Sequence, residues 1–432
     1  MNEPTTVIQG ERYRLMLLTP QLILLEYAPD GIFEDRPTQK VQNRAFPPVE
    51  HRLWRTERGI ELSTAFMNVF YDEGPFSYGG LWIENRSECR GIYCTWHYGD
   101  ALTENLGGTA RTLDEADGPV PLEPGILSRL QGYSVLDDST SYALTEDGWI
   151  EPPRPGHQDL YFFSYGYAYQ ALADFFHLCG PTPLLPRYAL GNWWSRFHAY
   201  TAEEYLSLMD RFEKSGIPLS VAVIDMNWHI SSDGSDHKGW TGYTWDKALF
   251  PEPAAFLKAL HQRGLRVTLN LHPAEGIQPH EVAYPQAAAA LGRDAARGQR
   301  IPFEPGNRAF WRVYFDLLHR PLERQGVDFW WIDWQQGRAC AIEGMDPLWL
   351  LNHFHAQDAV RKGRRAFILS RYAGAGSHRY PAGFSGDSVI SWRSLQFQPY
   401  FTATASNIGY GWWSHDIGGH THGKRDDELQ TR

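Results

Sequence analysis

Four units in the second half of the chain share one order: an amphipathic helix, a glycine, and a short apolar run that ends on a polar residue. In the first unit, Thr201 and Glu204 have the spacing of a capping box, in which each side chain satisfies a backbone amide of the other residue. Gly216 ends this helix, and an apolar run over residues 219–224 leads to Asp225. This order predicts parallel strands that are buried on both faces and joined by helices.

The other three units repeat the order, with helices expected over residues 253–263, 310–325 and 347–362, each followed by a glycine. The apolar runs behind these helices end on polar residues: His272, Asp333, and the pair Ser370 and Arg371. Such units build either a closed βα-barrel or an open, doubly wound sheet. No glycine-rich phosphate loop follows any of these runs, which favours the barrel, whose active site lies at the carboxyl ends of its strands.

The first 180 residues have a different pattern, in which short apolar runs alternate with turn residues. Strands are expected over residues 15–18, 22–27, 82–85 and 133–136. This spacing is typical of a β-sandwich. Because the proline-rich segment Pro181–Pro186 marks a boundary, we expect a sandwich domain over residues 1–180 and a barrel domain over residues 181–432.

Charge and cysteine content restrict the partners and the compartment. The net charge is −11, and no Lys/Arg-rich run is present, so neither a nucleic-acid nor a membrane partner is expected. The first residues lack the pattern of a signal peptide, and no stretch has the length of a membrane span. Four scattered cysteines without a CxxC pair indicate reduced thiols in a cytoplasmic protein: Cys89, Cys94, Cys179 and Cys340.

Polar residues at the expected strand ends are the candidates for chemistry: Asp225, His272, Asp333, Arg371, Asp387 and Asp416. Carboxylates that converge without a metal are typical of glycoside hydrolysis, in which one carboxylate attacks the sugar and another carboxyl protonates the leaving oxygen. An alternative is that some of them are structural partners of Arg371 or Arg379. The high aromatic content, 14% with 17 tryptophans, is also compatible with a sugar-binding cleft.

A metal site is the alternative to this interpretation. His415, His420 and His422 lie near Asp416, and histidine-rich tracts can bind metal. The surrounding glycines are typical of a loop, so solvated histidines are the expected state. We therefore expect neither a metal nor a cofactor.

An ordered set of motifs resembles glycoside hydrolase family 31, the family of α-glucosidases and α-xylosidases. The resemblance runs from about Leu22 to the last residue, and each motif is weak by itself, whereas their order is specific. The motifs lie at residues 33–38, 105–114, 191–196, 223–226, 331–333, 370–371, 384–387 and 414–419.

The resemblance implies that Asp333 is the nucleophile and that Asp387 is the general acid/base. It also implies that Asp225, Arg371 and Asp416 hold the sugar in subsite −1, with Phe384 where many members have Trp. The full set of residues expected to contact the substrate is Asp225, His272, Trp331, Arg371, Phe384 and Asp416. The substrate would be an α-linked oligosaccharide or glucoside, and a homo-oligomer is compatible with the sequence.

Two departures from the family pattern leave the sugar and the linkage open. The family often reads Trp-x-Asp-Met-Asn-Glu at the nucleophile, where this chain has Asp333 followed by Trp-Gln-Gln, and Asn227 replaces the second Asp of an Asp-x-Asp pair. The expected activity is that of a retaining, exo-acting α-glucosidase. The alternatives are an α-xylosidase, an α-galactosidase-type enzyme, or an inactive sugar-binding fragment.

The number of expected strands adds one more expectation. Seven strands can be placed between Leu190 and Ser414, and a closed (β/α)₈ barrel needs eight. The sequence thus predicts a barrel that lacks its last unit, with exposed sheet edges and low activity in the isolated chain.

Overall fold

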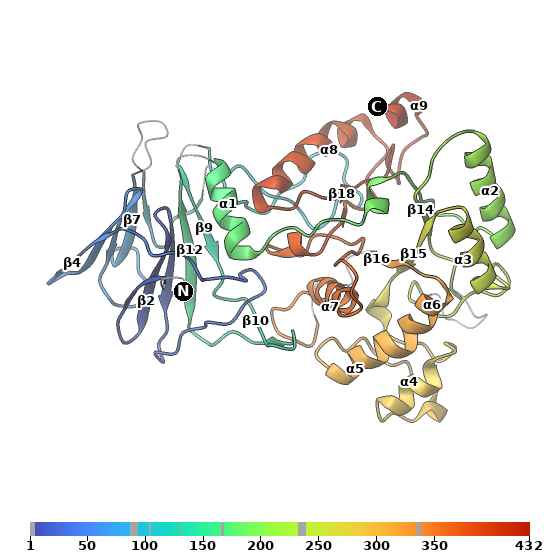
Figure 1. Ribbon diagram of the computed structural model, residues 1–432, viewed down its shortest axis with the longest axis horizontal. Helices are drawn as coiled ribbons and strands as arrows, with labels where there is room; N and C mark the ends of the chain where they lie inside the picture. The colour runs from blue at the N-terminus through green and yellow to red at the C-terminus, as the bar shows by residue number, and fades with distance from the viewer. Residues whose placement is uncertain are drawn as a thin grey trace. The chain divides into compact units, whose positions relative to one another are not determined.

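The computed structural model describes residues 5–86, 94–102, 105–129, 131–165, 168–231, 239–333, 337 and 340–432. The chain divides into two compact units (Figure 1). The first unit comprises Met1–Thr182, Gly374–Arg379 and Asp387–Arg432, and the second comprises Pro183–Ala373 and Tyr380–Gly386. The expected boundary after residue 180 lies close to the start of the second unit. Because Asp387–Arg432 groups with the first unit, the assignment of residues 181–432 to one domain stays a prediction.

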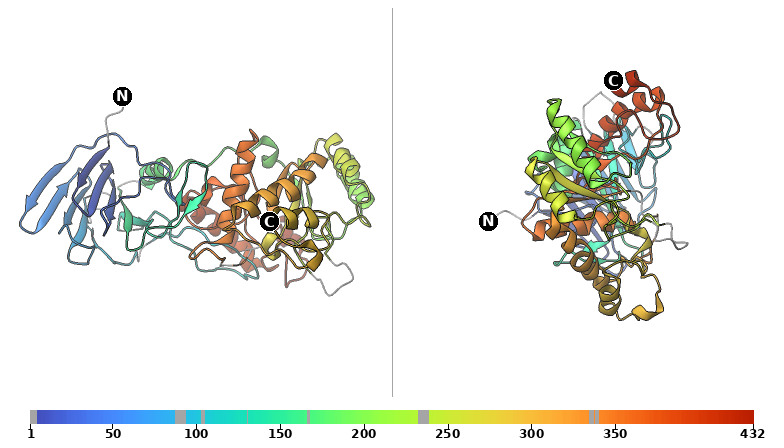
Figure 2. Two further views of the ribbon diagram at one scale, coloured as in Figure 1. Left: turned by 90° about the horizontal axis from the view of Figure 1, so that it is seen from below. Right: turned by 90° about the vertical axis from the view of Figure 1, so that its right-hand side faces the viewer.

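The first unit contains a sandwich of two antiparallel sheets (Figure 2). One sheet has the order β1 (Thr6–Gln9), β2 (Tyr13–Thr19), β3 (Leu22–Tyr27), β12 (Gln158–Ser164) and β9 (Tyr133–Asp137). The other has the order β4 (Arg52–Thr56), β5 (Gly59–Ser63), β6 (Met67–Tyr71), β7 (Leu81–Asn85) and β8 (Cys94–His97). Leu15 and Ile23 of the first sheet share one core with Val69 and Ile83 of the second. This arrangement confirms the predicted β-sandwich.

The first unit also contains the strand pair β10 (Ala143–Leu144) and β11 (Ile150–Glu151), and the elements α1 (Ala168–Cys179), α8 (Trp392–Ala405), β18 (Trp413–Ser414) and α9 (Asp427–Thr431). Helix α8 packs Phe397 and Phe401 against Leu113, which belongs to a long connection between β8 and β9. Ile126 of the same connection donates its backbone amide to the Asn407 carbonyl. These contacts attach the connection to the segment that follows Asp387.

The second unit is built around parallel strands in sequence order: β13 (Trp193–Trp194), β14 (Val221–Ile224), β15 (Arg266–Leu271) and β16 (Phe329–Ile332). Parallel bridges from Trp331 to Leu369 and from Ser370 to Gly383 continue this order to β17 (Gly383–Phe384). A doubly wound sheet reverses its strand order at a switch point, whereas these strands do not reverse. The order therefore agrees with the predicted barrel.

Helices connect the strands along the chain (Figure 1): α2 (Ala202–Lys214), α3 (Pro253–Gln262), α4 (Tyr284–Ala290), α5 (Arg308–Val313), α6 (Arg320–Gln325) and α7 (Pro347–Arg361). All of these except α4 lie within or overlap helices that the sequence predicts. Both hydrogen bonds of the capping box between Thr201 and Glu204 are present. The helix expected over residues 310–325 is interrupted by the π-helical segment η4 (Tyr314–His319), which separates α5 from α6.

The strand expected over residues 366–369 is replaced by irregular backbone with single bridges at Leu369 and Ser370. Ile368 donates its backbone amide to the carbonyl of Pro381. The segment keeps its place in the parallel order, because Leu369 donates its amide to the Trp330 carbonyl and its carbonyl accepts from the Ile332 amide.

The structure also bears on the expected free thiols and on the expected absence of a membrane span. Cys94, Cys179 and Cys340 are free thiols, as predicted, whereas Cys89 lies outside the described residues. In the part of the chain that the structure describes, no helix combines the length and the apolar character needed to cross a membrane.

Candidate active site

Three of the predicted site residues directly follow neighbouring parallel strands. Asp225 follows β14, His272 follows β15 and Asp333 follows β16. The register pairs Leu271 of β15 with Ile332 of β16, and carried one residue further it places His272 beside Asp333. Because parallel strands end at one edge of the sheet, the three residues lie at that edge.

The Asp333 carboxylate is held at both of its oxygens. Arg371 donates from Nη2 to Oδ1 over 3.0 Å, and Asn270 donates from Nδ2 to Oδ2 over 3.0 Å. His272 Nε2 lies 3.4 Å from Oδ2. The Arg371 side chain is fully buried, and that of Asp333 is 14% exposed. The carboxylate therefore has a fixed orientation and keeps a small accessible surface.

The surroundings of Asp333 keep it ionised. Burial raises the pKa of its carboxyl, but the hydrogen bond from His272 and the positive charge of Arg371 outweigh burial. The pKa of Asp333 is consequently held well below its ordinary value. A deprotonated carboxylate with fixed oxygens is the form that a nucleophile requires.

Arg371, Phe384 and Trp331 form a packed layer beside the carboxylate. The Arg371 guanidinium lies 5.2 Å from the centre of the Phe384 ring, and Trp331 meets the same ring edge-on with centroids 5.4 Å apart. Trp331 and Phe384 are both buried, so they belong to the barrel interior. The Trp331 ring therefore has no open face on which a sugar could stack, and its indole N–H is the group through which the expected contact with a substrate would form.

Asn270 is the site residue that the sequence analysis missed. It is completely buried in β15, and its backbone carbonyl accepts a hydrogen bond of 2.8 Å from the Trp228 indole. A signal existed: Asn270 is a polar residue in an apolar run, two positions before His272, and strand alternation places residues i and i+2 on one face.

Among the described residues, the buried polar atoms at this site include an acceptor and a donor that have no hydrogen-bond partner. They are Oδ1 of Asn270 and Nε1 of Trp331. A buried polar atom without a partner is costly, so such atoms are typical of sites that a ligand completes. One is an acceptor and the other is a donor, and a hydroxyl group can bond to either.

Asn227 lies in the connection after β14, and Glu281 lies in the connection after β15. Asn227 has a φ of 70°, a left-handed conformation that asparagine tolerates better than most residues. Glu281 is buried and accepts hydrogen bonds from the Tyr243 backbone amide and the Thr244 hydroxyl. Burial raises the pKa of Glu281 to about 7, although these hydrogen bonds oppose the shift.

Asp387 and Asp416, the other predicted carboxylates, belong to the first unit. The backbone amide of Asp387 donates to Oδ1 of Asp114 over 2.8 Å, and the Asp387 carbonyl accepts from the Glu115 amide over 2.9 Å. Asp387, Asp416 and His420 each place one potential ligand atom within 4.8 Å of the others. The structure thus brings Asp387 and Asp416 together. Acidic clusters are common without a metal, and the expectation of no metal stays a prediction.

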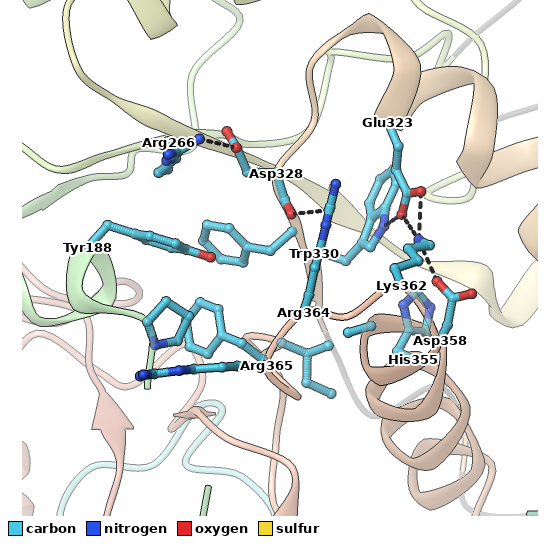
Figure 3. Close-up of a pocket in the computed structure, with 15 residues that line it drawn as sticks. Tyr188, Arg266, Glu323, Asp328, Trp330, His355, Asp358, Lys362, Arg364 and Arg365 are labelled. Carbon is cyan, nitrogen blue, oxygen red and sulfur yellow. Dashed lines mark hydrogen bonds and ion pairs between the residues drawn. The ribbon is translucent and has the colours of Figure 1, made fainter. Parts of the chain in front are cut away.

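A cavity of about 380 Å³ lies elsewhere in the second unit (Figure 3). It adjoins the amino-terminal ends of β15 and β16, where Arg266 pairs with Asp328 over 2.9 Å. On its other side Lys362 bridges Glu323 and Asp358, at 2.6 Å from each. Arg266 and Lys362 are paired with lining carboxylates, Arg364 and Arg365 donate to backbone carbonyls, and the cavity is at the opposite strand ends from Asp333. It is therefore not the candidate active site.

Comparison with protein families decides the assignment of the fold. Residues 182–432, more than half of the chain, match the model described as the glycosyl hydrolases family 31 TIM-barrel domain. The chain belongs to glycoside hydrolase family 31. This finding confirms the resemblance that the sequence motifs indicated and agrees with the parallel strand order.

Named relatives in family 31 include enzymes for two different sugars. The chain is 24% identical over 349 residues to an α-xylosidase of Saccharolobus solfataricus, covering 73% of this chain and 45% of that protein. It is 24% identical over 310 residues to α-glucosidase 2 of Bacillus thermoamyloliquefaciens, covering 64% of this chain and 38% of that protein. The chain thus spans less than half the length of both relatives.

Solved family 31 structures share the fold. A family 31 α-xylosidase from a soil metagenome, complexed with xylose, superposes with a TM-score of 0.68 at 14% identity, covering 100% of this chain and 74% of that one. A Flavobacterium johnsoniae family 31 dextranase complexed with glucose gives a TM-score of 0.68 at 15% identity, covering 97% and 61% of the two chains. At this identity the likeness establishes the fold alone.

Proposed function

We propose that this protein is a retaining α-glycoside hydrolase that removes a single sugar from the non-reducing end of an α-linked oligosaccharide or glucoside. The observation that carries the proposal is the Asp333 carboxylate, which is buried, ionised and held at both oxygens by Arg371 and Asn270. Membership in family 31 and the position of Asp333 after the fourth parallel strand support the same role.

In the proposed first step, Asp333 attacks the anomeric carbon, and the bond from that carbon to the leaving oxygen breaks. Asp387 donates its proton to the leaving oxygen, so that an alcohol departs and a β-linked glycosyl–enzyme forms. In the second step, Asp387 takes a proton from water as the water attacks the anomeric carbon. The bond to Asp333 breaks, and the sugar leaves with its original α configuration.

The other predicted residues would bind the hydroxyl groups of the sugar. Asp225 lies at the end of the strand beside β15, and Arg371 is fully buried next to the nucleophile. Oδ1 of Asn270 and Nε1 of Trp331 supply an acceptor and a donor that sugar hydroxyls would satisfy. Asp416, which lies close to Asp387 in the first unit, is assigned to the same binding role.

Both α-glucosides and α-xylosides are candidate substrates. The motifs favoured an α-glucosidase, whereas the comparisons include α-xylosidases of Saccharolobus solfataricus and Lactiplantibacillus pentosus beside α-glucosidases. The two sugars differ by one hydroxymethyl group at C5. A substitution of this size changes the binding free energy by about 1–3 kcal/mol, so pocket shape decides the preference.

A panel of 4-nitrophenyl substrates carrying α-glucosyl, α-xylosyl or α-galactosyl groups tests the proposal. We expect release of nitrophenol from the glucoside or the xyloside, with the α-anomer of the sugar as the first product detected by proton NMR. Release from the galactoside alone would contradict the sugar assignment. Formation of the β-anomer would contradict a retaining mechanism, and no release from any member by the folded full chain would contradict hydrolase activity.

A further inference from the structure

The cavity at the amino-terminal strand ends has two sides that differ in charge (Figure 3). On one side, Lys362 is paired with the carboxylates of Glu323 and Asp358, at 2.6 Å from each. On the other side, the single carboxylate of Asp328 lies with three arginines: Arg266, Arg364 and Arg365. The lining residues of this second side therefore carry an excess of two positive charges (3 − 1).

The carboxylate of Asp328 is already occupied by other partners. Its Oδ1 accepts a hydrogen bond from Arg266 over 2.9 Å, and His261 Nε2 lies 2.8 Å from its Oδ2. Among the residues that the structure describes, this carboxylate forms no ion pair with Arg364 or Arg365. The positive charges of these two arginines are thus available to a ligand.

Arg364 and Arg365 are both exposed, and each is held at the cavity by backbone carbonyls. Nη1 of Arg364 donates to the Asp328 carbonyl over 3.0 Å, as Figure 3 shows, and Nη1 of Arg365 donates to the carbonyls of Leu184 and Leu185. A guanidinium has five N–H groups, so both side chains keep donors for a ligand. Phosphate and carboxylate groups are the acceptors that match a guanidinium in shape and charge.

Tyr188 adds an aromatic wall on the same side of the cavity. Its ring packs against those of Phe329 and Phe367, with centroids 5.7 Å and 5.9 Å away, and the Arg266 guanidinium lies 5.9 Å from the centre of the Tyr188 ring. Burial raises the pKa of Tyr188 to about 12, so its hydroxyl keeps its proton at neutral pH. The positively charged side of the cavity therefore combines an apolar wall with hydrogen-bond donors.

We propose that this cavity binds a small organic anion, whose phosphate or carboxylate group contacts Arg364 and Arg365 and whose apolar part packs against Tyr188. A volume of about 380 Å³ is in the range of cavities that hold small molecules. The excess of positive charge favours an anion, and the aromatic wall favours an anion with an apolar part over an inorganic ion. The inference goes beyond the proposed hydrolase function, because the cavity lies at the opposite strand ends from Asp333.

Binding to the full chain tests the proposal without any turnover. Isothermal titration at neutral pH and constant ionic strength compares phenyl phosphate, benzoate, inorganic phosphate and phenol. We expect phenyl phosphate or benzoate to bind with one molecule per chain, and the tighter of the two identifies the anionic group. Phenol lacks the charge and inorganic phosphate lacks the ring, so each should bind about tenfold more weakly. Equal affinity for either of these, or no binding of both aromatic anions, would overturn the proposal.

Arginine variants test which side chains contact the anion. Arg364→Gln and Arg365→Gln each remove one positive charge and should weaken binding of the aromatic anion by about fivefold to tenfold. As a matched control, Arg52→Gln removes an exposed arginine from the β-sandwich and should leave the affinity unchanged. An equal loss in all three variants would mean that only the net charge of the chain matters, and it would overturn the site.

A variant that keeps every arginine separates loss of the cavity from loss of charge. Ala359 of α7 is half-buried and lines the cavity, so Ala359→Leu should fill part of the space and weaken binding of the aromatic anion more than that of inorganic phosphate. Unchanged affinity in an Ala359→Leu protein that unfolds at the wild-type temperature would overturn the site.

Competition distinguishes this cavity from the candidate active site. Glucose and xylose should not displace the aromatic anion, because the proposed sugar site lies at the other ends of the strands. Displacement by either sugar would place the anion near Asp333 and overturn the proposal. None of these measurements depends on hydrolysis, so their failure leaves the proposed function standing, and an inactive chain that binds the anion leaves the cavity site standing.

Discussion

Asn270 donates a hydrogen bond from Nδ2 to Oδ2 of Asp333 over 3.0 Å, and the asparagine side chain is completely buried. With Arg371 on the other carboxylate oxygen, this bond fixes the plane of the carboxylate. A nucleophile that must approach an anomeric carbon along one line depends on such an orientation. Asn270 is therefore a positioning residue for the proposed reaction.

Replacement of Asn270 should slow the reaction more than it weakens binding. A hydrogen bond to a charged group contributes about 1.5–3 kcal/mol, so we expect Asn270→Ala to lower kcat by about 10- to 100-fold. Asn270→Asp keeps the shape but places a second negative charge beside Asp333, which should raise the pKa of Asp333 and move the acidic limb of the kcat/KM profile to higher pH.

A matched control exists in the β-sandwich. Asn68 donates from Nδ2 to the Glu84 carboxylate over 2.7 Å, which is the same kind of contact away from the site. Asn68→Ala should leave both kcat and the pH profile unchanged. If the Asn270 and Asn68 variants had the same kinetics, the positioning role would be wrong.

Variants of the two proposed catalytic carboxyls should differ in kind. Asp333→Ala should abolish turnover, because no covalent intermediate can form. Asp387→Ala should keep activity on substrates with good leaving groups such as a glycosyl fluoride, because these leave without a proton. Azide should restore the rate of the Asp387 variant and yield the α-glycosyl azide, identified by NMR. Recovery of the β-azide from that variant would mean that the two roles are reversed.

The distance between the two carboxyls tests the stereochemical outcome. Asp333 and Asp387 belong to different units, and a retaining mechanism requires their oxygens to lie about 5–5.5 Å apart across the bound sugar. A crystal structure with a sugar-shaped inhibitor should give this value. A separation of about 6.5–9.5 Å in such a complex would instead indicate an inverting enzyme.

Glu281 should make stability depend on pH. Its pKa is raised by burial from an ordinary value of 4.5 to about 7, so the folded state favours the protonated form. Its contribution to stability is thus complete below about pH 4.5 and is lost as the pH rises through 7, a change of about 3 kcal/mol. Urea unfolding at pH 4.5, 6 and 7.5 should show this loss in the wild type and not in Glu281→Gln. As a control, Glu57→Gln, a substitution in an exposed turn, should lose as much unfolding free energy between pH 4.5 and 7.5 as the wild type. The same loss in Glu281→Gln would contradict the prediction.

Local patterns in the chain were enough to predict the elements and several site residues. The capping box at Thr201, the glycine after each helix and the two-residue alternation of the sandwich strands depend on near neighbours, so their structural consequences can be derived from spacing alone. Asp225, His272 and Asp333 could be proposed for the same reason, because each ends an apolar run and the ends of parallel strands share one edge.

The partners of these residues depended on how distant segments meet in space. Asn270 reaches Asp333 across 63 positions, and the Asp387 amide reaches Asp114 across 273. Such contacts follow from strand register and from the packing of loops, neither of which leaves a periodic signal in the chain. The same reason applies to residues 366–369, whose apolar composition predicts a strand. Only the fold decides that Leu369 and Ser370 form single bridges there in place of a regular strand.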